Sequence, residues 1–385
     1  MAFDFPSAPT VGQVYQGYTW DGEKWAGGST PGSVRYDVAQ SLATPEQTQA
    51  RQNIFAAPFD AMAYHGIAVN GDARFAQEGA TPRITTGYVV DGWLVSPNGT
   101  MQISAQQVID APSGLVASIK ISVTTAQASL GANDYVLLGQ MIEGYDAARL
   151  GFGLSNARPV SLGFWSKIHR PGPYSGMVQN GASNRTYSFQ FTQNAADTWE
   201  YKTVTIPGDL TGTWDRAAGL GLRVTFTMAV GSTYQTAPDG WKAGNFLGVP
   251  GSTNGVAATT DTFQITGLVV LPGLEVPSAA SAPFVLRPFA QEQRRCQRYL
   301  SYMNAGLRFS ATGAGQIAET MIHWPVAMRA APTASLAAPG MSSNVLSGYP
   351  QVQSVDANSA RYMIAANAAG DCYALVQSVK CDARL

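Results

Sequence analysis

Aromatic side chains beside amides and cations are the residues of this sequence whose types and spacing best suit chemistry. A sugar presents apolar C–H faces and ring hydroxyls, so a saccharide site needs a flat aromatic surface next to hydrogen-bonding groups. Trp165 lies on the polar side of an expected strand, and Trp241 follows a Pro-Asp-Gly turn at 238–240. The predicted saccharide contacts are Trp165, Tyr174, Arg185, Trp241 and Asn245. The alternative for each aromatic residue is packing in the core, at its rim or in a subunit interface.

Catalytic motifs are absent from the sequence. There is no GxSxG elbow, phosphate-binding loop, HExxH pair or dinucleotide fingerprint. A polysaccharide-cleaving enzyme would need two carboxylates on either side of a groove. The acids nearest to expected strands form no interpretable pair in sequence: Glu143, Asp146, Asp197, Glu200, Asp215, Asp239, Asp261 and Glu319. We therefore predict no catalytic residue, and an acid pair assembled by the fold is the alternative.

The cysteines and histidines predict neither a metal site nor a disulfide framework. Cys296, Cys372 and Cys381 are odd in number, lack CxxC spacing, and have only three histidines to join them. An offset of nine places Cys372 and Cys381 on opposite faces if they share one strand. Free thiols, no metal and no cofactor are expected, as in a protein that folds in a reducing cytosol.

Composition excludes several classes of partner. Only 13% of the 385 residues are charged and the net charge is -1, whereas nucleic acid or an anionic membrane favours a basic excess. No apolar run approaches the roughly 20 residues of a membrane span, and the N-terminus lacks the features of a signal peptide. The chain is expected to bind no nucleic acid and to enter no membrane.

Period-two alternation over residues 70–273 predicts strands. In GLRVTFTMAV, the apolar residues Leu222, Val224 and Phe226 alternate with Arg223 and Thr225. The segments PVSLGFWSKI and RTYSFQFTQ repeat the pattern, and further strands are expected at 101–108, 115–125, 135–143, 174–179, 199–206 and 261–271. No helix-period segment interrupts them, so the prediction is an all-β, two-sheet antiparallel sandwich of the jelly-roll type.

Residues 1–33 are expected to form a small hairpin module. Four aromatic residues surround the turn at Asp21-Gly22, namely Tyr15, Tyr18, Trp20 and Trp25. A hairpin of this size is hard to stabilise alone. We predict that it docks on another protein through these aromatic residues, and an ordinary capping hairpin is the alternative.

Residues 34–69 carry the predicted helix. Thr44 fits the N-cap, Pro45 the first helical position and Gln47 a capping box, and the helix must end before Pro58. A thin apolar stripe follows at Ala50, Ile54 and Phe55. So short a helix is marginal alone, which predicts a neck buried against copies of itself or against the sandwich.

Residues 274–385 are expected to form a second β domain after a Pro- and small-residue linker at 275–284. Strands are predicted at 305–310, 316–324, 333–337, 360–366 and 372–379. The arginines at 294, 295 and 298 are interpreted as solvated or paired with Glu292, with an acidic sugar as the alternative. Trp324 is expected to pack on the core at a strand end.

Ordered blocks of sequence resemble tail-fibre and tail-appendage proteins of bacteriophages. The blocks are NGDARFAQEG at 70–79, DGW at 91–93, LGFWSKI at 162–168, NRTYSFQFT at 184–192, DTWEYKTVTIPGDLTGTW at 197–214, ITGLVVLPG at 265–273 and RRCQRYLSYM at 294–303. The N-terminal FPSAPTVGQ and YTWDGEKW are similar to an attachment module of phage tail proteins, and the segment around the helix to a connector of trimeric fibres. Gly92 departs from the pattern, where a basic residue is common.

The resemblance implies a jelly roll like that of carbohydrate-binding modules, carried on a virion that is assembled in the host cytoplasm. The chain would be a homotrimeric fibre or appendage subunit that attaches to other phage proteins through its N-terminus and binds host surface polysaccharide without catalysis. A tailspike depolymerase and a head-fibre or collar decoration without an essential ligand are the alternatives. Long solenoid repeats, which would favour a depolymerase, are not found.

Overall fold

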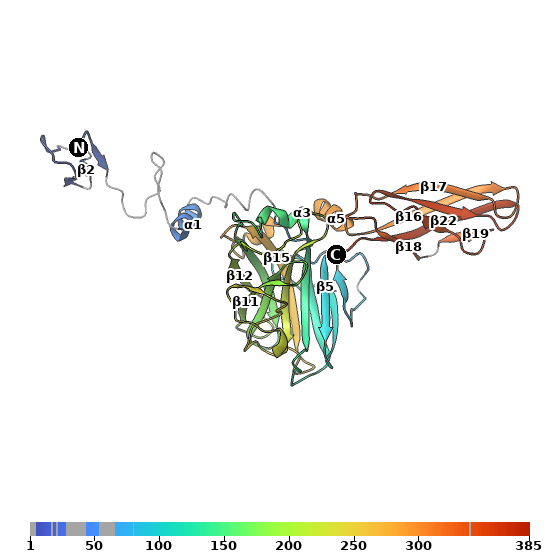
Figure 1. The fold of residues 1–385 in the computed structure, drawn as a ribbon, viewed down its shortest axis with the longest axis horizontal. Coiled ribbons are helices and arrows are strands. Elements are labelled where there is room, and N and C mark those ends of the chain that lie inside the picture. The colour runs from blue at the N-terminus through green and yellow to red at the C-terminus, as the bar shows by residue number, and fades with distance from the viewer. Residues whose placement is uncertain are drawn as a thin grey trace. The chain divides into compact units, whose positions relative to one another are not determined.

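The computed structural model describes residues 5–16, 18–20, 22–27, 44–53, 66–79, 81–338 and 340–385. Contacts divide the chain into two compact units, residues 1–58 and 59–385. The described part is built mainly of antiparallel strands with a few short helices, so the all-β prediction is confirmed (Figure 1).

The first unit contains a three-stranded antiparallel sheet of β1 (Val14–Tyr15), β2 (Tyr18–Trp20) and β3 (Trp25–Gly27). The four aromatic residues expected to mediate attachment contact one another or Phe5: Tyr18 and Trp25 lie with ring centroids 5.3 and 5.2 Å from that of Phe5, and Trp20 lies 5.7 Å from Trp25. These rings therefore form the core of the small sheet. Attachment to another protein stays a prediction.

Helix α1 (Thr44–Asn53) confirms the predicted helix over these residues. The side chains of the expected capping box, Thr44, Pro45 and Gln47, lie outside the described part of the structure, as do Ile54 and Phe55 of the apolar stripe. The neck interaction is therefore untested.

Two antiparallel sheets form the jelly-roll sandwich of the second unit (Figure 1). The seven-stranded sheet has the order β14-β11-β10-β13-β8-β5-β4, and the five-stranded sheet the order β12-β9-β15-β7-β6. The strands are β4 (Gly87–Val90), β5 (Trp93–Asn98), β6 (Gln102–Val108), β7 (Ser118–Thr125), β8 (Tyr135–Glu143), β9 (Val160–Ile168), β10 (Gly172–Gln179), β11 (Arg185–Gln193), β12 (Glu200–Ile206), β13 (Leu220–Val230), β14 (Trp241–Ala243) and β15 (Thr262–Pro272). Short helical turns α3 (Gly144–Ala147), η1 (Ala148–Leu150) and η2 (Ser232–Tyr234) lie in the connections.

The period-two pattern decides which side chains fill the space between the sheets. The apolar residues of β13, Leu222, Val224 and Phe226, are fully buried in one core cluster with Phe164 of β9. The intervening residues of β13, including Arg223, face away from that core. The alternation read in the sequence is thus confirmed for both sheets.

The C-terminal part begins with helices, not strands. The turn α4 (Ala282–Val285) and helix α5 (Phe289–Gln297) precede β16. Helix α5 was not among the elements predicted from the sequence. The helix contains few apolar residues, and its buried residues are Glu292 and Cys296. The sequence therefore lacks the apolar spacing that predicts an amphipathic helix.

The remaining strands form two sheets. The four-stranded sheet has the order β16-β22-β18, with β19 also paired with β22, and the three-stranded sheet has the order β17-β21-β20. Their bounds are β16 (Leu300–Ala311), β17 (Ile317–His323), β18 (Thr333–Ala338), β19 (Met341–Ser343), β20 (Gln351–Gln353), β21 (Ser359–Ala365) and β22 (Gly370–Asp382). A separate core cluster contains Trp324, as expected, together with Cys372 and Cys381.

The two cysteines of β22 share one core, so the expectation of opposite faces was wrong. The pairing of β22 with β16 shifts register: Ala305 faces Gln377, and Leu307 faces Ala374. One residue of β16 therefore lies opposite two residues of β22, Leu375 and Val376, which form a β-bulge. The extra residue changes the parity of the strand, so both thiols point inward. All three cysteines are free and buried.

Candidate functional site: a groove on the seven-stranded sheet

A groove lies on the outer face of the seven-stranded sheet, with a cavity volume of about 310 Å³. Its floor comes from β5, β8 and β13, and its wall from η2 and from the connection between β14 and β15. The groove is lined by Leu94, Ser96, Tyr135, Leu137, Gly139, Met141, Leu220, Arg223, Thr225, Tyr234, Asn245, Leu247 and Leu385. The volume is within the range of small-molecule sites, which begin at about 300 Å³.

Register explains the floor. Gly139 of β8 pairs with Thr225 of β13 on one side and with Leu94 of β5 on the other. A Cβ atom at Gly139 would lie 3.2 Å from Thr225 Oγ1 and from Met141 Cε. The glycine therefore leaves space beside the Thr225 hydroxyl at the centre of the floor, and the hydroxyl oxygen itself is buried.

The wall is held by hydrogen bonds from the sheet. Thr227 Oγ1 donates to the Leu247 carbonyl at 2.5 Å, and Gln179 Nε2 donates to Asn245 Oδ1 at 3.1 Å. At one end of the groove, where Tyr135 of β8 pairs with Val230 of β13, the half-buried rings of Tyr135 and Tyr234 meet edge to face with centroids 5.6 Å apart. The site thus combines two aromatic rings, aliphatic side chains and polar groups, as saccharide recognition requires.

Two polar side chains on the floor have unused hydrogen-bonding capacity. Thr225 is 2% exposed and its Oγ1 has no partner. Arg223 donates from Nη1 to Ser183 Oγ at 3.2 Å, while its buried Nε has no partner. Desolvation of the guanidinium lowers the pKa of Arg223.

Trp165 lies elsewhere on the molecule. It belongs to β9 of the five-stranded sheet, where it pairs with Tyr201 and Thr266 on the outer face. Its half-buried ring contacts that of Tyr201, with centroids 5.2 Å apart. Trp165 is therefore on the polar side of its strand, as expected, but on the opposite sheet from the groove.

Tyr174 does not contact solvent, and its prediction as a ligand contact was wrong. The side chain is fully buried, its ring stacks near Phe191, and its hydroxyl donates to the Arg170 carbonyl at 2.8 Å. The sequence of β10 around Tyr174 has no clear alternation, so it did not indicate the inward face.

Arg185 and Trp241 lie beyond β10 on the seven-stranded sheet and are already engaged. Arg185 makes a bidentate pair with buried Asp209 at 2.8 and 2.6 Å. Trp241 donates from Nε1 to the Pro207 carbonyl and packs against Phe152, Tyr187 and Trp214. Of the five predicted contacts, the groove contains Asn245 alone, so the fold does not bring them together.

Arg295 of α5 and Arg298, which follows the helix, bind acids of the sandwich. Arg298 makes hydrogen bonds of 2.8 and 2.6 Å to Glu143, which also accepts from the Tyr299 hydroxyl at 2.9 Å. Arg295 pairs with Asp146. Arg294 is exposed, as the solvated interpretation expected, whereas the pairing of Arg295 or Arg298 with Glu292 was wrong. Glu292 is buried and its carboxylate already accepts hydrogen bonds from Arg287 and from the Asn70 N–H.

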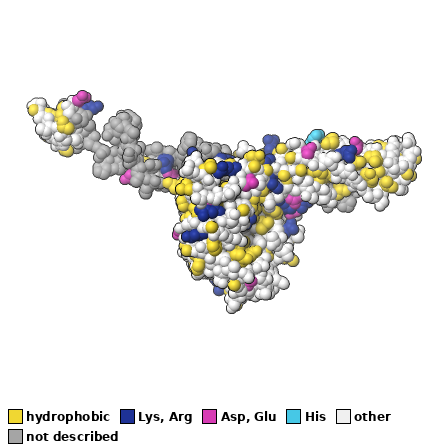
Figure 2. Space-filling view, in the orientation of Figure 1, with side chains coloured by type: hydrophobic (Ala, Val, Ile, Leu, Met, Phe, Trp, Pro, Cys, Tyr) yellow, Lys and Arg dark blue, Asp and Glu magenta, His cyan; other side chains and the backbone are white. Residues whose placement is uncertain are grey.

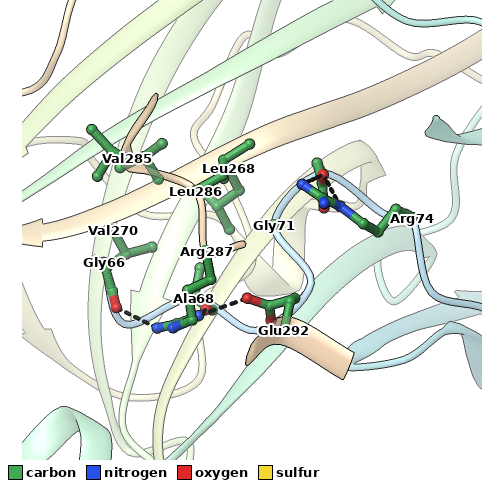
Figure 3. Close-up of a pocket in the computed structure, with 12 residues that line it drawn as sticks. Gly66, Ala68, Gly71, Arg74, Leu268, Val270, Val285, Leu286, Arg287 and Glu292 are labelled. Carbon is green, nitrogen blue, oxygen red and sulfur yellow. Dashed lines mark hydrogen bonds and ion pairs between the residues drawn. The ribbon is translucent and has the colours of Figure 1, made fainter. Parts of the chain in front are cut away.

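Arg287 fills a second, smaller cavity (Figure 3). Its guanidinium reaches the carbonyls of Gly66 and Ala68 at 2.5 and 2.7 Å and the Glu292 carboxylate at 3.0 Å. The remaining volume of about 10 Å³ holds no more than one water molecule. The contacts of Arg287 therefore hold the segment after the linker against the start of the sandwich. We call these contacts of Arg287, Arg295 and Arg298 the joint.

No protein-family model and no curated protein matches this sequence. Solved structures that it resembles include the enzymatically active domain of tailspike protein 4 of bacteriophage CBA120, at 13% identity and a TM-score of 0.29 over 57% of this chain and 24% of that one. A family 11 carbohydrate-binding module from Clostridium thermocellum, in complex with a mixed-linked tetrasaccharide, matches at 12% identity and 0.26 over 51% and 98%. A xylan-binding domain from Paenibacillus barcinonensis matches at 8% and 0.25 over 51% and 99%. At these TM-scores the likenesses assign no ligand.

Within the described ranges, no group of His, Cys, Asp or Glu side chains is arranged to hold a metal ion. No helix of those ranges is long and apolar enough to cross a membrane. On the face in Figure 2, charged side chains are scattered among larger uncharged areas, as expected from a chain with 13% charged residues.

Proposed function

We propose that this chain is a non-catalytic, saccharide-binding subunit of a phage tail fibre or related virion appendage, and that the groove contacts host surface polysaccharide. The observation that carries the proposal is the groove itself, which has two tyrosine rings at one end and Arg223 on its floor. The Arg223 guanidinium hydrogen-bonds Ser183 through Nη1, and its Nε has no partner. The ordered sequence blocks support the virion role. Attachment through the N-terminal module and trimer formation through α1 belong to the same proposal.

Binding at one groove is expected to be weak. A shallow saccharide site exchanges hydrogen bonds to water for hydrogen bonds to sugar, so a dissociation constant near ~1 mM is expected. Three copies that engage together would raise the avidity about a hundredfold. A trimer therefore gives useful adhesion from individually weak sites.

The test uses the full chain on a panel of immobilised bacterial surface polysaccharides. The double variant Tyr135→Ala/Tyr234→Ala removes the rings of the groove, and Trp165→Ala removes a ring from the opposite sheet as the matched control. Binding of the wild type and the control, with roughly tenfold or greater loss in the double variant, supports the proposal. Equal binding by all three proteins, or by none, overturns it, and reducing ends that accumulate during incubation overturn the non-catalytic role.

A further inference from the structure

The charge distribution of the groove points to a more specific ligand. Of the described residues that line it, Arg223 alone has a charged side chain. Arg223 is partly buried, and no carboxylate of the described part of the chain lies within ion-pair distance of it. A partly desolvated cation without a counter-charge is unfavourable unless a ligand supplies one.

Other partly buried arginines of the second unit show the contrast. Arg185, Arg287 and Arg298 each bind a carboxylate whose side chain is at most 5% exposed. The fold can therefore provide an acid for an arginine that has only a structural role. At Arg223, the cross-strand neighbours are instead Met141 and Gln179, neither of which carries a charge.

From this geometry we propose that the groove recognises an acidic saccharide, and that Arg223 binds the carboxylate of a hexuronate or similar sugar acid. This inference rests on the proposed function and names the class of its ligand. A guanidinium presents a planar fork that matches a carboxylate, and its single charge balances a monoanion better than a phosphate of nearly two charges.

The surroundings of Arg223 suit the remainder of such a sugar. Leu94, Leu137 and Met141 provide an apolar floor for C–H faces. Thr225, two residues from Arg223 on the same face of β13, has a buried hydroxyl without a partner. The rings of Tyr135 and Tyr234 border one end of the same floor. The carboxylate and the C–H faces of such a sugar thus each find a matching protein group.

The experiment pairs ligands as well as proteins. Uronate-containing bacterial polysaccharides are immobilised beside their carboxyl-reduced forms, which keep the sugar rings but lose the charge. The full-length wild type, Arg223→Met and Arg223→Lys are then titrated on both. Met keeps the aliphatic stem without charge, whereas Lys keeps the charge without the fork.

We expect the wild type to bind acidic forms roughly tenfold or more tightly than reduced forms, since hydrogen bonds to charged groups are the stronger ones. Arg223→Met should abolish that preference by weakening only the acidic interaction, and Arg223→Lys should retain part of it. Equal affinity of the wild type for both forms, or equal loss on both forms in Arg223→Met, overturns the inference.

The outcome separates this inference from the proposed function. If the wild type binds reduced and acidic forms equally, and Tyr135→Ala/Tyr234→Ala abolishes binding to both forms, the groove binds saccharide but does not select an acidic one. If no protein binds either form, the proposed function and the inference are both wrong. A change in the solution mass of Arg223→Met would instead assign Arg223 to a contact between copies, and preference for sugar phosphates on the same panel would overturn the carboxylate assignment.

Discussion

The arginines of the joint and the arginine of the groove have opposite surroundings. Arg298 is held by both oxygens of Glu143, whose side chain is 2% exposed, and Arg295 by Asp146. Arg223 has a serine hydroxyl and no acid. The first arrangement fixes one part of the chain on another, whereas the second leaves a cation available to a ligand. The absence of an acid beside Arg223 is what makes it a candidate for ligand binding, although Arg329 shows that backbone carbonyls can also hold an arginine.

The largest change in the free energy of unfolding is expected from a substitution at the joint. Arg298→Met leaves the buried Glu143 carboxylate with only the Tyr299 hydroxyl, and loss of one partner of a buried pair typically lowers the free energy of unfolding by about 3 to 5 kcal/mol. Urea denaturation of the full chain measures this change. The matched control is Arg308→Met, because the Arg308–Asp371 pair has side chains 64% and 48% exposed and should contribute nothing measurable. Similar losses in both variants would contradict the assigned role of the joint.

Asp91 tests the converse case, a buried acid without a cation partner. Burial raises the pKa of Asp91 to about 6, although a hydrogen bond from Gln77 opposes the rise. Between its ordinary pKa of 3.8 and about 6, the folded protein holds a proton that the unfolded chain releases, so stability falls as the pH rises through this window.

Asp91→Asn keeps an oxygen that can accept from Gln77 but cannot ionise. Its free energy of unfolding should exceed that of the wild type by about 3 kcal/mol near pH 7, with the difference vanishing below about pH 4. Denaturant titrations at the two pH values measure the difference. A gap that is unchanged between them would show that Asp91 does not titrate in this window.

Tyr174 sharpens the distinction between the core side and the groove side of the seven-stranded sheet. Tyr174→Phe removes one buried hydrogen bond, to the Arg170 carbonyl, and should lower stability by about 1 kcal/mol without changing saccharide affinity. Thermal denaturation and polysaccharide titration of the same sample check both statements. Weaker saccharide binding at unchanged stability would restore Tyr174 as a ligand contact.

The strands were accessible from sequence because their evidence is local. Alternation along Leu222, Val224 and Phe226 also predicts that Arg223 lies on the outer face. That signal, a cation in the middle of an apolar strand, could have identified Arg223 as a candidate. An aromatic ring on a polar face is the more familiar sign of a saccharide site, and it indicated Trp165 and Trp241 instead.

The groove itself was not accessible, because its residues come from strands that are distant in the chain. Leu94, Gly139 and Thr225 become neighbours only through the strand order β13-β8-β5. The absence of an acid beside Arg223 is likewise a property of the fold. Side-chain partners such as Glu143 for Arg298 are 155 residues away in sequence, and no local pattern indicates them.

A small change in stability, of the opposite sign, is expected in the groove. Arg223→Met removes a partly desolvated cation that has no counter-charge, while the methionine keeps an apolar stem against Met141. The free energy of unfolding should therefore rise by about 1 kcal/mol, even though affinity for acidic saccharide falls. Urea denaturation in the absence of saccharide measures this change in the free energy of unfolding. A loss of stability comparable with that of Arg298→Met would place Arg223 among the structural arginines. A gain is the result expected for a partly desolvated cation that has no counter-charge in the folded protein.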